Sequence, residues 1–256
     1  MTASTPAEGD SGARPTYEAY AADSDEPEPR FTDWLRERSE PAWTDAVDHP
    51  FTRELADGTL AEDAYADYLV QDYAFVGQLV GAFGHAVGQA PDMAAKRRLV
   101  EFLETVTDDE DDYFERSFDA LSVPESRRQD PDLAEPTAAF IDLLGRATGE
   151  GGYAETLAVL VPAEWIYEAW ATAAVETHAD SAADGPPSAG TELPFYYAEW
   201  IDLHAVEPFC EFVAWLRSQL DAIGPELSPR RQRRVAALFG RTVTLEVAFF
   251  DAAYER

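Results

Sequence analysis

The segment PAEWIYEAW, residues 162–170, places an acidic side chain inside an aromatic run. It begins with a proline and sets Glu164 beside Trp165, Tyr167 and Trp170. Apolar residues at steps of three and four predict a helix whose buried face includes this carboxylate. A proline within that helix would bend it just before Glu164, although a break between two shorter helices is the alternative. Because an unpaired buried carboxylate costs several kcal/mol or becomes protonated, the segment needs a structural or chemical reason.

The same helical period runs through most of the chain and predicts an all-α fold of one domain. Thr59 and Glu62 have the spacing of a capping box. Ser228 followed by Pro229 is typical of a helix start. Residues 179–193 are small, polar and proline-bearing, which predicts a loop. The predicted helices cover residues 32–47, 59–87, 91–121, 136 to 145 or 148, 153–177, 194–203, 207–223 and 229–256.

The first 30 residues differ in composition from the rest. They are rich in Ala, Ser, Pro, Asp and Glu and poor in large aliphatic residues. Such a segment cannot bury enough apolar surface to fold, so we expect a disordered acidic tail at 1–30 and a helical domain at 31–256.

The chain is strongly acidic, with 19 Lys and Arg against 50 Asp and Glu and a formal charge of -31. Self-repulsion of this size is relieved in molar salt, where the screening length falls to about 3 Å. We therefore expect a cytoplasmic protein of a halophilic organism, with no nucleic acid or membrane as partner. A short basic run is interpreted as a solvated helix face rather than a DNA contact. The run comprises Arg230, Arg231, Arg233 and Arg234.

Other sequence features narrow the class of protein further. The chain has one cysteine, which excludes an internal disulfide. It has neither the apolar run of a membrane span nor the pattern of a secretory signal.

Three carboxylates fall on predicted buried faces of three different helices. They are Asp72, Glu164 and Glu246. A single such acid is more often a hydrogen-bonded core residue, but three flanked by aromatic side chains favour one shared polar pocket. Acids with raised pKa values against flat apolar walls suit proton transfer on a planar heterocycle. The candidate walls, each of which alone could be plain core, are Phe75, Phe140, Tyr167, Tyr197, Phe249 and Phe250.

Metal and cofactor chemistry receives no support from the sequence. A di-iron helix bundle needs Glu-x-x-His pairs, and no carboxylate stands three residues before any of the four histidines. The chain also has no glycine-rich loop to hold a phosphate. We therefore expect neither a metal nor a cofactor.

Four stretches together resemble the TenA (thiaminase II) family of aminopyrimidine hydrolases. They are YLVQDYAFV at 68–76, VPAEWIYEAW at 161–170, YYAEWIDLH at 196–204 and LEVAFFDAAY at 245–254. The resemblance extends over nearly the whole chain after the tail. It implies a heme oxygenase-like helical bundle assembled as a homotetramer. It also implies hydrolysis of 4-amino-5-aminomethyl-2-methylpyrimidine, or of its N-formyl derivative, to the hydroxymethyl pyrimidine in thiamin salvage.

The resemblance also implies roles for particular residues. Asp72 would bind the pyrimidine ring nitrogen and its amino group, and Glu246 would protonate the leaving amine. Many relatives have a tyrosine where this chain has Phe140. The better-known branch has a nucleophilic cysteine at the position of Ala163, so thiamin cleavage is less expected here, and Glu164 is a candidate base that activates water. The residues expected to line the ring pocket are Phe75, Phe140, Tyr167, Tyr197 and Phe249.

Two other functions remain open on the sequence alone. A protein that binds pyrimidines or thiamin without turnover would need Asp72 and the aromatic walls but not two further buried acids. A regulatory protein would fit the older name of the family as a transcriptional activator, although the charge of -31 argues against direct DNA contact.

Overall fold

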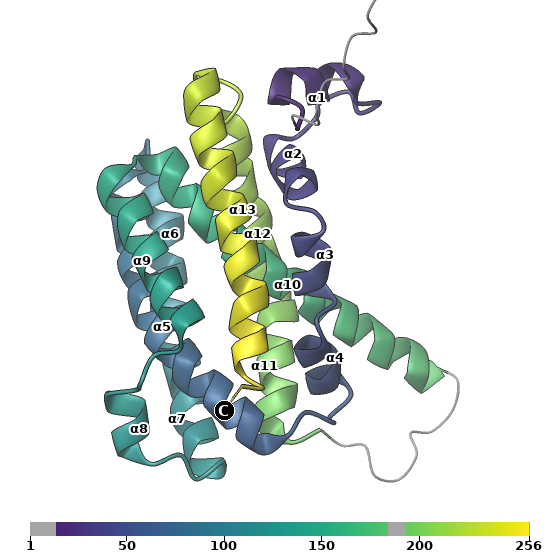
Figure 1. Cartoon of the computed structure of the whole chain (residues 1–256), viewed down its shortest axis with the longest axis vertical. Coiled ribbons are helices and arrows are strands. Elements are labelled where there is room, and N and C mark those ends of the chain that lie inside the picture. Colours follow the sequence, from purple (N-terminus) through teal and green to yellow (C-terminus); the bar gives the residue numbers. More distant parts are fainter. Residues whose placement is uncertain (1–13, 184–192, 256) are drawn as a thin grey trace, which may run out of the picture.

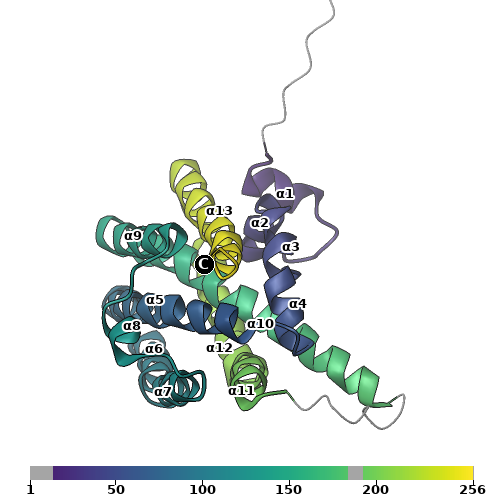
Figure 2. The same cartoon turned by 60° about the horizontal axis from the view of Figure 1, so that its bottom comes forward.

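The computed structural model describes residues 14–183 and 193–255, and within these ranges the chain forms helices and no strand. The predicted all-α fold is therefore confirmed, as a single bundle (Figures 1 and 2). The α-helices are α1 (Tyr17–Asp23), α2 (Phe31–Arg38), α3 (Ala42–Val47), α4 (Pro50–Ala56), α5 (Glu62–Gln89), α6 (Met93–Thr105), α7 (Asp111–Ala120), α8 (Glu125–Gln129), α9 (Glu135–Glu150), α10 (Tyr153–Ala183), α11 (Phe195–Ala205), α12 (Glu207–Ile223) and α13 (Pro229–Ala252).

Helix α10 is the central element, in contact with α5, α9, α11, α12 and α13. Every residue from 157 to 161 is fully buried, as expected for a helix with neighbours on all sides. The proline at 162 lies inside this one continuous helix, which excludes the alternative of two shorter helices. The end of α10 projects away from the bundle (Figure 1), and Val175, predicted to be in the buried stripe, is 39% exposed there.

The N-terminal segment departs from the prediction in two places. Residues Tyr17–Asp23, inside the expected disordered tail, form α1. The ring centroid of Tyr17 lies 5.1 Å from that of Phe31 and 5.8 Å from that of Trp34. These aromatic contacts, which the composition of the segment did not reveal, hold α1 against α2. Residues 1–13 of the expected tail lie outside the described residues. The helix predicted at 32–47 is divided into α2 and α3 by Pro41, which cannot continue a helix from its interior.

Several helix boundaries also differ from the predicted ones. The N-cap of α5 is Ala61, with no side-chain cap, so the expected capping box does not form. The predicted helix at 91–121 comprises α6, a π-helical turn η1 (Val106–Glu110) and α7. Helix α10 continues past the predicted loop start at 179, and residues 184–192 of that loop lie outside the described ones.

Part of the basic run on α13 has a structural role. The guanidinium of Arg231 donates to both carboxylate oxygens of Glu155, at 3.0 and 2.7 Å. Glu155 is 2% exposed, and this two-point contact lowers its pKa against the effect of burial. Arg231 therefore joins the start of α13 to the start of α10 and is not simply a solvated residue.

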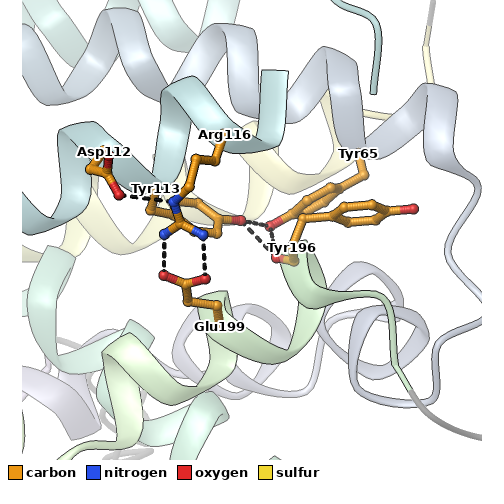
Figure 3. A network of polar contacts seen from close by, with 6 residues as sticks. All are labelled: Tyr65, Asp112, Tyr113, Arg116, Tyr196 and Glu199. Atoms are coloured by element: carbon orange, nitrogen blue, oxygen red, sulfur yellow. Dashed lines mark hydrogen bonds and ion pairs between the residues drawn. The ribbon is translucent and has the colours of Figure 1, made fainter. Parts of the chain in front are cut away.

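A network of polar contacts joins α7 to α5 and α11 (Figure 3). The guanidinium of Arg116 donates to both carboxylate oxygens of Glu199, with one N–O distance of 2.9 Å. It also donates to Asp112 at 2.8 Å. Beside it, the hydroxyls of Tyr65 and Tyr113 lie 3.0 and 2.7 Å from the carbonyl oxygen of Tyr196 (Figure 3). The turn η1, directly before α7, is thereby held against the rest of the bundle.

No helix among the described residues is long and apolar enough to cross a membrane. Within the same part of the chain, no group of three or more His, Cys, Asp and Glu side chains is arranged to hold a metal ion.

Candidate active site

A cavity of about 350 Å³ lies between α5, α6, η1, α10, α11 and the start of α12. Its walls are mostly apolar, and its ionisable lining is dominated by carboxylates. The residues that border it are Asp72, Phe75, Val76, Leu79, Arg98, Glu101, Phe102, Thr105, Val106, Glu110, Ala163, Glu164, Tyr167, Trp200, Leu203, His204, Val206, Pro208, Phe209 and Phe212. A concave, mostly apolar space with a few convergent polar groups is the usual form of a small-molecule site.

Asp72 enters the cavity from the middle of α5 and is only 3% exposed. The hydroxyl of Tyr68, one turn earlier, donates to its Oδ2 at 3.1 Å and lies 2.8 Å from the hydroxyl of Tyr167. Burial raises the pKa of Asp72 to about 7, and the hydrogen bond from Tyr68 opposes that rise. Asp72 can therefore exist in either protonation state near neutral pH.

Glu164 enters from α10 and is 7% exposed. Burial, with a smaller contribution from the charge of Asp72, raises its pKa to about 8. Ala163 borders the cavity beside it, with a side chain that ends at the β-carbon. Pro162 cannot donate a helical hydrogen bond, which leaves this part of α10 less constrained by its own backbone.

Glu246, on α13, is 1% exposed and lies behind the cavity lining rather than on it. Among the described residues its Oε1 has no hydrogen-bond partner. Burial, followed by the charges of Asp72 and Glu164, raises its pKa well above the ordinary value. The three acids expected to share one pocket are thus close enough to influence one another's protonation.

A fourth carboxylate, Glu110, borders the cavity and was not predicted. It is the last residue of η1, and burial together with the charges of Asp72 and Glu164 raises its pKa well above the ordinary value. The sequence carried a signal for Glu110, because the apolar residues Val106, Tyr113 and Phe114 stand at helical spacing around it. All three are buried in the structure. Its acidic neighbours in the segment TDDEDD concealed that stripe.

The predicted aromatic walls divide into two groups. Phe75 and Tyr167 border the cavity. Phe140 and Phe249 do not border it but pack behind Phe75, with ring centroids 4.5 and 6.1 Å from it. Phe250 is fully buried in the core.

Tyr197 is also absent from the cavity wall. Its hydroxyl donates to the carbonyl oxygen of Leu60 at 2.8 Å, one turn of α11 before the cavity begins. Trp200 and His204 of the same helix border the cavity instead. The periodic pattern selected the right face of α11 but could not say how far along it the cavity lies.

His204 contributes a neutral imidazole to the wall. Its Nδ1 lies 2.8 Å from the carbonyl oxygen of Trp200, which only accepts, so Nδ1 carries the proton. Burial lowers the pKa of His204 to about 4, so the ring brings no positive charge to the acids at neutral pH.

With this geometry established, comparison with known proteins places the chain in a family. The model of the TENA/THI-4/PQQC family matches residues 36–256. The chain belongs to this family. The family resemblance found in the four sequence stretches is thereby confirmed.

Curated relatives in the family carry an enzyme name. The chain is 25% identical over 224 residues to the aminopyrimidine aminohydrolase of Halalkalibacterium halodurans, covering 88% of this chain and 95% of that protein. It is 21% identical to the protein of the same name from Helicobacter pylori, covering 88% and 99% of the two chains.

Solved structures agree with the fold of the family. A TenA family protein from Silicibacter sp. TM1040, titled a transcription regulator, has a TM-score of 0.74 at 22% identity, covering 90% of this chain and 99% of that one. A domain from Shewanella denitrificans titled as having a heme oxygenase-like fold has a TM-score of 0.62 at 13% identity, covering 88% and 92%. The expected heme oxygenase-like helical fold is therefore confirmed.

Proposed function

We propose that this protein hydrolyses 4-amino-5-aminomethyl-2-methylpyrimidine, or its N-formyl derivative, to the hydroxymethyl pyrimidine used in thiamin salvage. Membership of the family and the name of its curated relatives support the reaction class. The observation that carries the proposal is that two buried acids, Asp72 and Glu164, border one aromatic cavity, while a third, Glu246, is buried close enough for their charges to raise its pKa.

Asp72 is proposed to hold the pyrimidine. A carboxyl group whose pKa is about 7 can present both a donor and an acceptor edge to a ring nitrogen and its neighbouring amino group. Tyr68 fixes the orientation of that carboxyl group, and Phe75 and Tyr167 offer apolar surface to the flat ring. None of three other predicted wall residues borders the cavity, so we expect no contact between them and the ring. They are Phe140 and Phe249, which pack behind the wall, and Tyr197, which lies beyond it.

The proposed chemistry replaces a carbon–nitrogen bond with a carbon–oxygen bond. Glu164 accepts a proton from water, whose oxygen bonds to the exocyclic methylene carbon. The bond from that carbon to nitrogen breaks, and the protonated nitrogen departs as ammonia, with Glu246 as the proposed acid that supplies its proton from behind the cavity lining. Two interacting carboxylates with raised pKa values suit this division, since one can be ionised while the other is protonated.

The test is an end-point assay of the purified protein in molar KCl with three substrates. They are the aminomethyl pyrimidine, its N-formyl derivative and thiamin. We expect ammonia and hydroxymethyl pyrimidine from the first, whereas release of formate from the second would identify a deformylase. Binding of the pyrimidine without product in any of the three reactions would overturn the enzymatic proposal and leave a binding protein.

The quaternary state and cellular location are further parts of the proposal. We propose a cytoplasmic homotetramer, as the family resemblance implies. Light scattering in molar KCl tests the tetramer, and a mass equal to one chain of 28.3 kDa would contradict it.

A further inference from the structure

Glu110 gives the cavity an acid that the proposed reaction does not use. It borders the same space as Asp72 and Glu164 but comes from η1, the turn between α6 and α7. A π-helical turn contains one residue more than an α-helical turn, and such turns occur frequently at functional sites. The extra residue changes the direction in which the following side chains project.

The position of Glu110 is fixed by contacts on the residues that follow it. The hydroxyl of Tyr73 on α5 donates to Asp111 at 2.9 Å, and Arg116 binds Asp112 at 2.8 Å. Arg116 in turn grips Glu199 on α11, as Figure 3 shows. Glu110 itself is partly buried, and no described residue hydrogen-bonds to its carboxylate. The structure thus holds its backbone in place and leaves its oxygens available.

The charge of the cavity is unbalanced. Its acids are Asp72, Glu101, Glu110 and Glu164, and its only cationic side chain among the described residues is Arg98, which lies 4.0 Å from Glu101. His204 is neutral. This leaves Asp72, Glu110 and Glu164 without a cation. Carboxyl groups in such a setting favour the protonated form, and a positive group beside them favours the ionised form.

Two neighbouring side chains have hydrogen-bonding capacity that no described residue uses. Glu164 is 7% exposed, borders the cavity and receives no hydrogen bond from any described residue. Behind it, Glu246 is 1% exposed, and its Oε1 also lacks a partner within the described chain. Core carboxylates without partners are rare unless a ligand completes the site.

We propose that Glu110 binds the protonated aminomethyl group of the substrate, so that the site selects the cationic amine over neutral pyrimidines such as the N-formyl derivative. This inference rests on the proposed function. A primary aminomethyl group is protonated at neutral pH, as the lysine side chain is. Its three N–H donors match the available carboxylate oxygens, and hydrogen bonds between charged partners are stronger than neutral ones. The bound cation favours the ionised form of Glu110, so binding releases a proton wherever that group was protonated beforehand.

The test compares two ligands of nearly equal shape and different charge, the aminomethyl and hydroxymethyl pyrimidines. Their affinities are measured by calorimetry in molar KCl, in the Glu164→Gln background to prevent turnover. Adding Glu110→Gln is expected to weaken binding of the amine about ten-fold or more, the effect of losing a charged partner. Binding of the hydroxymethyl compound should change by less than about three-fold, since its hydroxyl carries no charge.

Matched variants separate a local effect from a general one. Glu104→Gln removes the same charge from an exposed position on α6 outside the cavity, and is expected to leave the affinity ratio unchanged. Glu110→Asp retains the charge and should keep a preference for the amine, which Glu110→Gln loses. Circular dichroism of each variant verifies that it is folded.

Each outcome separates this inference from the proposed function. If the wild-type protein hydrolyses the amine but Glu110→Gln weakens both ligands equally or neither, the role of Glu110 is wrong and the function stands. If no hydrolysis occurs but Glu110→Gln removes a preference for the amine, the function is wrong and the cation site stands. If the Glu164→Gln protein with Glu110 intact does not bind the aminomethyl pyrimidine more tightly than the hydroxymethyl pyrimidine, the inference is wrong.

Discussion

The hydroxyl of Tyr68 donates to Oδ2 of Asp72 at 3.1 Å, and the two residues lie one turn apart on the same helix. Among the described residues, no other contact counteracts the effect of burial on the pKa of Asp72. Because Tyr167 meets the same hydroxyl at 2.8 Å, Tyr68 also joins Asp72 to the α10 wall. A residue outside the predicted site thus orients a residue at its centre.

Substitution Tyr68→Phe should move the basic limb of the pH profile of kcat/KM to higher pH. The hydrogen bond lowers the pKa of Asp72 from the value that burial alone would give, so its loss raises that pKa above about 7. More Asp72 is then protonated near neutral pH, and this is the form that can donate to the ring nitrogen. The profile of the aminomethyl pyrimidine should shift by roughly one pH unit, equivalent to about 1.4 kcal/mol. A basic limb at the wild-type position would contradict this role.

Substitution Glu164→Gln should lower kcat by about 10²-fold or more, as for loss of a positioned base. Initial rates of ammonia release measure this effect. Glu168→Gln is the matched control, one turn further along α10 and outside the cavity lining. Wild-type turnover in Glu164→Gln would exclude the proposed base.

The same Glu164→Gln substitution should stabilise the fold at pH 8. A carboxyl group with an ordinary pKa of 4.5 in the unfolded chain and about 8 in the folded protein binds more protons when folded. Stability is therefore lost as the pH rises between those values, and a glutamine avoids that loss. We expect a melting temperature several degrees above wild type at pH 8 in molar KCl, and a smaller difference at pH 5. Equal differences at both pH values would mean that ionisation is not the cause.

The sequence located the three central acids because helical period alone determines which face a residue occupies. Asp72, Glu164 and Glu246 each fell on a stripe of apolar residues, and all three are buried. The same reasoning could not identify which aromatic residues reach the cavity, since that depends on how far each helix extends past its neighbours. Trp200 rather than Tyr197 borders it for this reason.

The helices of the fold could be predicted from the sequence to a similar extent. Long helices such as α12 and α13 followed from periodicity and proline positions, and α12 has the predicted bounds of Glu207–Ile223. Contacts between distant segments were not predictable from local pattern. Helix α1 depends on Tyr17 meeting Phe31 and Trp34, and local composition alone had indicated disorder there.

The charge of -31 predicts a fold that requires salt. Repulsion between carboxylates extends about 10 Å at 0.1 M ionic strength and only about 3 Å at 1 M. The melting temperature should therefore rise by several degrees between 0.1 and 2 M KCl and recover reversibly after dialysis. NaCl of equal ionic strength is the control for a specific effect of potassium. An unchanged melting temperature across this range would rule out charge repulsion as the main cause of instability at low salt.

Substitution Arg116→Met should loosen the turn that carries Glu110. Arg116 joins α7 to α11 through Glu199, and its side chain is 42% exposed, so the global loss of stability should be below about 1 kcal/mol. The local effect should be larger, with faster amide hydrogen exchange at residues 106–113, because η1 is next to the released contact. Arg128→Met is the matched control, since Arg128 binds Glu115 and Asp119 of α7 but not α11. Equal exchange at η1 in the two variants would show that the contact with Glu199 does not hold the turn.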